Sequence, residues 1–294
     1  MEPEELTSYV ASLVHCLRWM PATDVNDETK TDFIEALTEI SALPAESIDM
    51  EVRRLLVEDT SDAIKHVVSA LSCRDVLLKC KAANAIGSIC TSRVAGQRLL
   101  DVYGEELITS LTKMATTKNT WAQADAYSVF GWMVVIAEES MVQQLARLVP
   151  AAIKLLQRNL SAHPSSTREE DANLCIYCLV FLLNFTQRDV SVFNAVHREL
   201  LLMLQQLIAR LVHDPSHEAE GMELVRLTVT LLSTLVDQSP DTTSLILELK
   251  MLPELLKLRK RLQSTELQVM LGPEDVDDLQ QRMAIVNDAV LARR

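Results

Sequence analysis

The residues of this chain with the greatest capacity for chemistry are two cysteines at CxxC spacing, Cys175 and Cys178. Thiolates at this spacing bind zinc or exchange disulfides, and a zinc site needs a second Cys or His pair to complete it. Here the two cysteines lie inside an apolar helical phrase, and the nearby sequence supplies no second pair. We therefore interpret them as small buried residues and expect neither a metal nor a redox function.

Two histidines, His213 and His217, bracket a polar stretch that we interpret as a solvated loop. The chain also lacks the short motifs that bind phosphates, activate a hydrolase serine or hold a protease zinc ion. We therefore expect no catalytic residue, no cofactor and no metal, and a protein that is not an enzyme. The enzyme alternative would require a cleft in which titratable groups converge.

A sequence phrase that occurs twice indicates helices that could position a binding surface. Residues 82–89 read AANAIGSI and residues 126–133 read AYSVFGWM, so that Gly87 and Gly131 are 44 residues apart. A helical phrase that recurs at roughly 40–47 residues is typical of armadillo and HEAT solenoids. Only 6 glycines and 9 prolines occur in 294 residues, which also favours an all-α chain.

The order of elements within this period resembles an armadillo repeat. Small residues, Ala82 and Ala83, open the long helix, and Gly104 stands before the second helix of the next unit, after a break expected around 94–96. The resemblance covers residues 61–262 and is strongest over 64–156. It implies an all-α, right-handed armadillo- or HEAT-like solenoid of about four to five repeats.

The ends of the chain do not match the repeat phrase. We interpret residues 1–60 as an N-terminal helical cap, because a solenoid must cover its first open layer. Residues 263–294 read as a linker followed by an amphipathic helix over 275–291. That helix either caps the last layer or swings free to bind a partner.

In armadillo proteins the third helix of each repeat lines a concave groove, where peptide-binding members place Asn, often with Trp one turn earlier. The Asn amide offers a donor and an acceptor to an extended peptide backbone. Only Asn184 keeps this Asn, and no repeat keeps the Trp–Asn pair. The exposure of Trp132 decides whether it is a binding residue or part of the core. The aligned positions predict a partner-binding set of Asn84, Ser88, Ser128, Trp132, Asn184, Thr230 and Thr234.

Charge narrows the classes of partner. The net charge of −13 argues against nucleic acid and against anionic membrane surfaces. The longest apolar run, Leu174 to Leu183, is too short to span a bilayer. One basic segment stands out, either as a solvated helix face or as a docking patch for an acidic partner: Lys250, Lys257, Arg259, Lys260 and Arg261.

These observations favour a non-enzymatic scaffold or adaptor that binds one or more proteins, alone or within a larger complex. Six cysteines inside apolar phrases and an acidic N-terminus favour the cytosol, with the nucleus as a second compartment. Two alternatives are regulators of nucleotide-binding partners. Residues 72–78 and 85–90 are similar to repeats of the armadillo-type dissociation stimulator of small GTPases. The overall size and the helical cap are similar to an armadillo exchange factor for seventy-kilodalton heat-shock chaperones.

Overall fold

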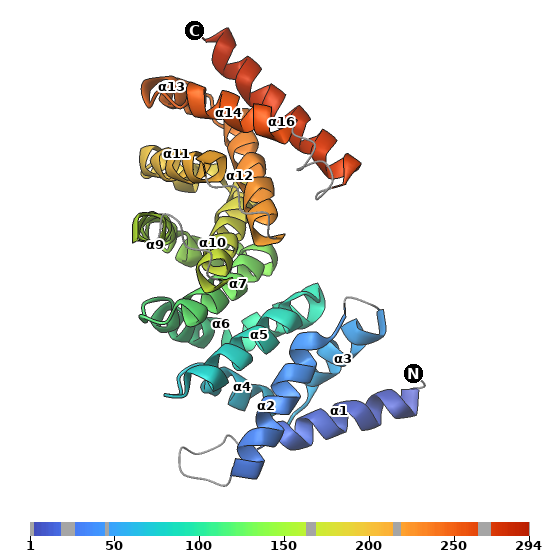
Figure 1. Cartoon of the computed structure of the whole chain (residues 1–294). Coiled ribbons are helices and arrows are strands. Elements are labelled where there is room, and N and C mark those ends of the chain that lie inside the picture. Colours follow the sequence, from blue (N-terminus) through green and yellow to red (C-terminus); the bar gives the residue numbers. More distant parts are fainter. Residues whose placement is uncertain are drawn as a thin grey trace. The chain divides into compact units, whose positions relative to one another are not determined.

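The computed structural model of the chain describes residues 3–18, 27–44, 47–162, 169–213, 219–263 and 272–293. Within these residues every regular element is a helix, and no strand is present (Figure 1). The chain divides into two compact units, Met1–Leu145 and Ala146–Arg294, which we call the N-terminal unit and the C-terminal unit.

The helices of the N-terminal unit are α1 (Pro3–Leu17), α2 (Asp27–Ala42), α3 (Ser47–Glu58), α4 (Ala63–Ala70), α5 (Val76–Cys90), α6 (Arg93–Ala115), α7 (Thr120–Ile136) and α8 (Glu139–Ala146), which ends at the division. Those of the C-terminal unit are α9 (Val149–Ala162), α10 (Glu169–Arg188), the 3₁₀ helix η1 (Val190–Phe193), α11 (His197–His213), α12 (Ala219–Gln238), α13 (Asp241–Glu248), α14 (Leu252–Leu262) and α16 (Pro273–Ala292).

Three helices of the N-terminal unit, α2, α5 and α7, lie side by side in chain order (Figure 1). At their N-terminal ends Lys30 of α2 forms an ion pair with Asp75, which precedes α5. Near the C-terminal ends the Ser88 hydroxyl of α5 donates to the carbonyl of Ile40 in α2 at 2.6 Å. The two helices therefore run parallel. Helices α5 and α7 carry the two copies of the repeated phrase.

Each helix of this row is backed by helices that precede it in the chain. Helix α1 packs against α2, α4 against α5, and α6 against α7. The segment predicted as a cap thus supplies a layer of its own, α1 with α2. The exposed side of α2 is acidic; its exposed carboxylates are those of Glu28, Asp32, Glu35 and Glu39.

Polar side chains fix the starts of α5 and α7. The carboxylate of Asp75 accepts from the backbone NH of Leu78 at 3.1 Å, and the amide oxygen of Asn119 accepts from the NH of Ala122 at 2.9 Å. Such caps satisfy backbone donors that a helix start otherwise leaves unpaired. Both parallel helices therefore begin at defined residues along the same row.

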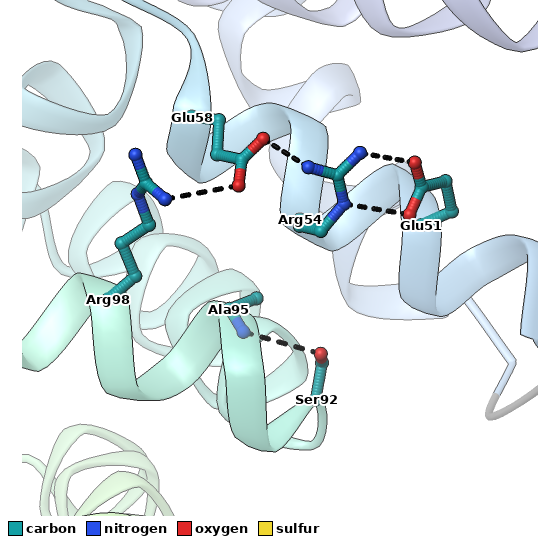
Figure 2. Close-up of polar contacts among 6 residues, drawn as sticks. All are labelled: Glu51, Arg54, Glu58, Ser92, Ala95 and Arg98. Atoms are coloured by element: carbon teal, nitrogen blue, oxygen red, sulfur yellow. Dashed lines mark hydrogen bonds and ion pairs between the residues drawn. The ribbon is translucent and has the colours of Figure 1, made fainter.

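The break expected around residues 94–96 is wrong, because α6 runs unbroken from Arg93 to Ala115. The hydroxyl of Ser92 accepts from the NH of Ala95 and starts the helix before the expected break (Figure 2). Gly104, which the repeat pattern placed between two helices, lies inside α6. The short and long helices of the pattern are thus fused into one.

Two glycines of α6 allow close packing and do not interrupt the helix. A Cβ on Gly96 would lie 2.5 Å from Cδ1 of Ile136 and 3.0 Å from Cα of Cys90. A Cβ on Gly104 would lie 2.2 Å from Cε of Met141. Glycine inside a helix costs roughly 1 kcal/mol relative to alanine. Here it permits α6 to approach the end of α7 and the start of α8.

A buried arginine joins the first layers of the N-terminal unit. The side chain of Arg53 in α3 is 1% exposed. Its guanidinium donates to the carbonyls of Leu43 at 2.6 Å, Pro44 at 3.0 Å and Ser88 at 2.7 Å, and to the Ser88 hydroxyl at 3.1 Å. These acceptors lie just after α2 and near the end of α5, where helix dipoles concentrate negative charge. Burial lowers the pKa of Arg53 below its usual value.

An ion-pair network joins α3 and α6 of the same unit (Figure 2). Glu58 of α3 pairs with Arg54 and, at 3.1 Å, with Arg98 of α6. Arg54 also holds Glu51 through its Nε at 2.8 Å. These side chains are partly exposed. Such pairs contribute roughly 0–1 kcal/mol each, so the network orients α3 against α6 more than it stabilises the fold.

The C-terminal unit repeats the same arrangement. Helices α10, α12 and α16 form one row, and α9, α11 and α14 form a second row that packs against it. The helix predicted over 275–291 is α16, which packs against α12, α13 and α14. Most of the linker that precedes α16 lies outside the described residues. Helices α11 and α13 are joined where His197 donates from Nε2 to the Thr242 hydroxyl at 3.0 Å, since that hydroxyl itself donates to Leu235 O.

Candidate functional site

One side of α5 and α7 gathers most of the sequence-predicted residues of the N-terminal unit, and we call it the α5–α7 face. Residues recurring at three and four positions share one side of a helix. The face comprises Leu77, Lys81 and Asn84 of α5, and Trp121, Ser128, Trp132 and Val135 of α7, with Asp125 buried beneath it.

Contacts between the two helices place residues of α7 beside residues of α5 at successive turns. The Asp125 carboxylate of α7 accepts hydrogen bonds from the thiol of Cys80 and the side-chain amide of Asn84 in α5. Two turns further on, the ring of Trp132 passes over Gly87, since a Cβ built there would lie 4.0 Å from its Cδ1. The sequence-predicted residues Asn84 and Trp132 thus lie on one surface with Ser128, which is half-buried.

Large apolar side chains of this face meet solvent. Trp121 and Trp132 are each 39% exposed, and Leu77 is 55% exposed. Val135, one turn beyond Trp132, is also exposed. The core alternative for Trp132 is therefore not what the structure shows. Two tryptophans separated by three turns of one helix form an apolar surface that a monomer leaves uncovered in water.

Asp125 sits beneath this surface, 8% exposed. Burial raises the pKa of its carboxyl to about 6, against the hydrogen bonds from Cys80 and Asn84 and the nearby charge of Lys81, which favour the carboxylate. Burial and the neighbouring carboxylate raise the pKa of the Cys80 thiol to about 12. The Cys80 thiol therefore stays protonated at neutral pH and is a poor nucleophile.

Ser88, in contrast, faces inward. It is buried, and its hydroxyl donates to Ile40 O and accepts from Arg53. The aligned position in α7 is Trp132, which is exposed. A small residue at position 88 lets α2 and α3 approach α5. The Ser88 hydroxyl is occupied within the unit and is not exposed to a partner protein.

The sequence-predicted residues of the C-terminal unit lie on α10 and α12, which are neighbours in one row of that unit. Asn184 is half-buried. Thr230 donates its hydroxyl to Arg226 O at 2.8 Å, and Thr234 donates to Thr230 O at 2.8 Å. Both threonine hydroxyls are thus occupied by the backbone of their own helix.

The two CxxC cysteines are enclosed in α10. Cys175 and Cys178 are buried, and burial raises the thiol pKa of Cys175 to about 12 and that of Cys178 well above its usual value. Cys175 donates to Asn159 at 3.5 Å, and Asn159 donates to the buried carboxylate of Asp171 at 3.0 Å. Protonated, enclosed thiols bind metals poorly.

The basic segment lies on and just before α14. Lys257 pairs with Glu254 at 2.8 Å, and Lys250 adopts a positive φ of 57° in the turn before the helix. Among the described residues no group of His, Cys, Asp and Glu could hold a metal ion, and no helix is long and apolar enough to cross a membrane. Of the two histidines noted in the sequence, His217 lies outside the described residues.

The sequence reasoning missed Trp121, Leu77 and Asp125. All three follow the same spacing of three and four residues as Trp132 and Asn84. They lie nearer to the start of each helix. Extending the spacing of three and four residues toward the start of α7 would have found Trp121 and Asp125. The repeated phrase drew attention to the ends of these helices, where the two copies are most alike.

No family model matches the sequence, and no curated protein matches it. Among solved structures, an engineered protein is similar over 96% of this chain and 97% of its own, with 17% identity and a TM-score of 0.64. A designed armadillo repeat protein is similar over 95% of this chain and 99% of its own, with 16% identity and a TM-score of 0.63. Together with the rows of neighbouring helices, this likeness confirms the fold predicted from the repeated phrase: the chain is an all-α solenoid with an armadillo-like repeat fold.

Proposed function

We propose that the protein is a non-enzymatic scaffold that binds a partner protein on the α5–α7 face. The observation that carries this proposal is the exposure of Trp121 and Trp132 on one side of α7. Residues that bind partners most strongly are enriched in tryptophan, because a large rigid ring buries much apolar area with few rotatable bonds.

The contacts that hold α5 and α7 in place support the proposal. Asn84 is exposed, and its side-chain amide donates to Asp125 beneath the face. The α5 and α7 backbones are fixed by caps and by the glycine contacts of α6. A preorganised face of this kind loses little conformational entropy on binding.

We expect Trp121→Ala combined with Trp132→Ala to weaken partner binding at least about 30-fold, which corresponds to ~2 kcal/mol. The measurement is a quantitative pull-down from cell extract, with bound proteins identified by mass spectrometry. Partners that wild type retains and the double variant loses are assigned to the face. Helical content should stay unchanged, and the melting temperature should fall by only a few degrees, because both rings are partly solvated.

The matched control is Val102→Ala, which truncates a 67% exposed apolar side chain on α6, outside the face. This variant should retain every partner. If the double-tryptophan variant retrieves the same proteins as wild type and the control, the α5–α7 face is not the docking surface. A loss of helical content in the double variant would place the two rings in the core and would also contradict the proposal.

A further inference from the structure

The start of α5 and the start of α7 lie at one edge of the N-terminal unit. The two helices are parallel neighbours, and each begins at a capping side chain. The loop before α5 reaches the C-terminal half of α6, where the hydroxyls of Ser72 and Ser110 lie 3.0 Å apart. The turn that follows α6 leads directly into α7. We call this region the α5–α7 edge.

Apolar side chains remain uncovered at this edge. Val76 and Leu77 occupy the first turn of α5, and Trp121 occupies the first turn of α7. All three are exposed. Leu77 and Trp121 lie one turn before the contact between Cys80 and Asp125, so they stand in the same row of the α5–α7 face.

Three cations lie at the ends of the elements that meet at this edge. Arg74 precedes α5, Lys113 lies in the last turn of α6, and Lys118 precedes α7; all three are exposed. None of them forms an ion pair with a carboxylate in the described part of the chain. The one acidic side chain at the start of α5, Asp75, already pairs with Lys30 and caps the helix. The N-terminal ends of α5 and α7 add partial positive charge.

This edge has the opposite sign to the protein as a whole, whose net charge is −13. Elsewhere in the N-terminal unit cations do pair with carboxylates, as Arg54 and Arg98 do with Glu58. Unpaired cations beside exposed Leu and Trp side chains therefore indicate complementarity toward an acidic partner that carries apolar residues.

We propose that the α5–α7 edge binds an acidic segment of a partner protein, with carboxylates at Arg74 and Lys118 and an apolar side chain over Leu77 and Trp121. This proposal rests on the proposed function, because it assigns the chemistry of the partner to one end of the same face. Opposite charge speeds the encounter and fixes orientation, while burial of the apolar side chain provides the affinity.

The probe is a fluorescein-labelled peptide of alternating Glu and Leu residues, titrated with the 294-residue chain and followed by fluorescence anisotropy. Two further peptides carry Lys in place of Glu, or Ser in place of Leu. We expect the Glu/Leu peptide to bind at least about tenfold more tightly than either of them, and the affinity to fall as salt is raised.

The test variant is Arg74→Glu combined with Lys118→Glu, and its matched control is Lys154→Glu combined with Arg158→Glu. The control makes the same change of charge at two exposed cations of α9 in the C-terminal unit. We expect the edge variant to lose affinity for the Glu/Leu peptide at least about tenfold more than the control does. Leu77→Ser should lower the affinity for the same peptide and change the salt dependence of that affinity little.

Equal loss in the edge variant and its control would show that only the net charge matters and would overturn the proposal. Equal binding of the Lys/Leu peptide would overturn it too, as would a preference for single-stranded RNA over the Glu/Leu peptide in competition. The proposed function is tested separately by the tryptophan variants. If those variants lose natural partners while the edge variant keeps them, the face binds proteins and only the acidic-segment proposal fails.

Discussion

Replacing Arg53 by Met should lower the free energy of unfolding of the N-terminal unit by about 3–5 kcal/mol. Methionine keeps much of the side-chain volume and removes every donor. The carbonyls of Leu43, Pro44 and Ser88 would then lose the guanidinium that satisfies them. A buried carbonyl without a partner costs roughly 1–3 kcal/mol. Helices α2, α3 and α5 would lose their common contact.

Urea unfolding followed by tryptophan fluorescence measures this effect in the full chain, because all 3 tryptophans precede residue 146. The neighbouring Arg54→Met is the matched control, and it should cost less than about 1 kcal/mol, since its ion pairs are partly exposed. Arg53→Lys should be nearly as harmful as Arg53→Met, because one ammonium cannot reach three carbonyls from one position. Equal stability of Arg53→Met and wild type would show that the hydrogen bonds of Arg53 do not stabilise the unit.

Replacing Asp125 by Asn should stabilise the protein at pH 8 and leave it nearly unchanged at pH 4. The pKa of Asp125 is raised by burial from 3.8 to about 6 in the folded protein. Its stabilising contribution is therefore full below pH 4 and is lost as the pH rises through 6. A difference of about two pKa units corresponds to ~3 kcal/mol, and Asn, which stays neutral, avoids this loss.

The same fluorescence-detected unfolding at a series of pH values tests this prediction. The stability difference between Asp125→Asn and wild type should grow from near zero at pH 4 to about 1–3 kcal/mol at pH 8. Asp101→Asn makes the same chemical change at an exposed position of α6 and should shift stability by less than about 0.5 kcal/mol at either pH. A constant difference across this pH range would mean that Asp125 is not held in a buried site.

The repeated phrase was sufficient to predict the fold because it lies in the helices that pack against each other. Residues 82–89 and 126–133 are in α5 and α7, and their spacing of one repeat becomes one step along a row of parallel helices. The same register placed Asn84 and Trp132 on one face. Helical periodicity is a local property of the sequence. It predicts correctly which residues share a face wherever the neighbouring layers of helices repeat as well.

Other features depend on contacts between distant segments. Arg53 lies 35 residues from Ser88, and nothing in its local sequence indicates burial. Ser88 and Trp132 align in the phrase, yet the first is buried by α2 and α3 while the second lies over Gly87. Gly104 resembled a helix boundary but permits a close approach of Met141. Alignment of one repeat with another cannot reveal which layer covers which residue.

Site-specific photocrosslinking tests the central claim, that the α5–α7 face binds a partner protein, most directly. A photoreactive phenylalanine analogue at Ser128, between the two tryptophans, should crosslink to the protein that wild type retains and the double-tryptophan variant loses. The same analogue at Val102, on α6, should not. Crosslinks to that partner from position 102 and none from position 128 would contradict the account and move the binding site off the α5–α7 face.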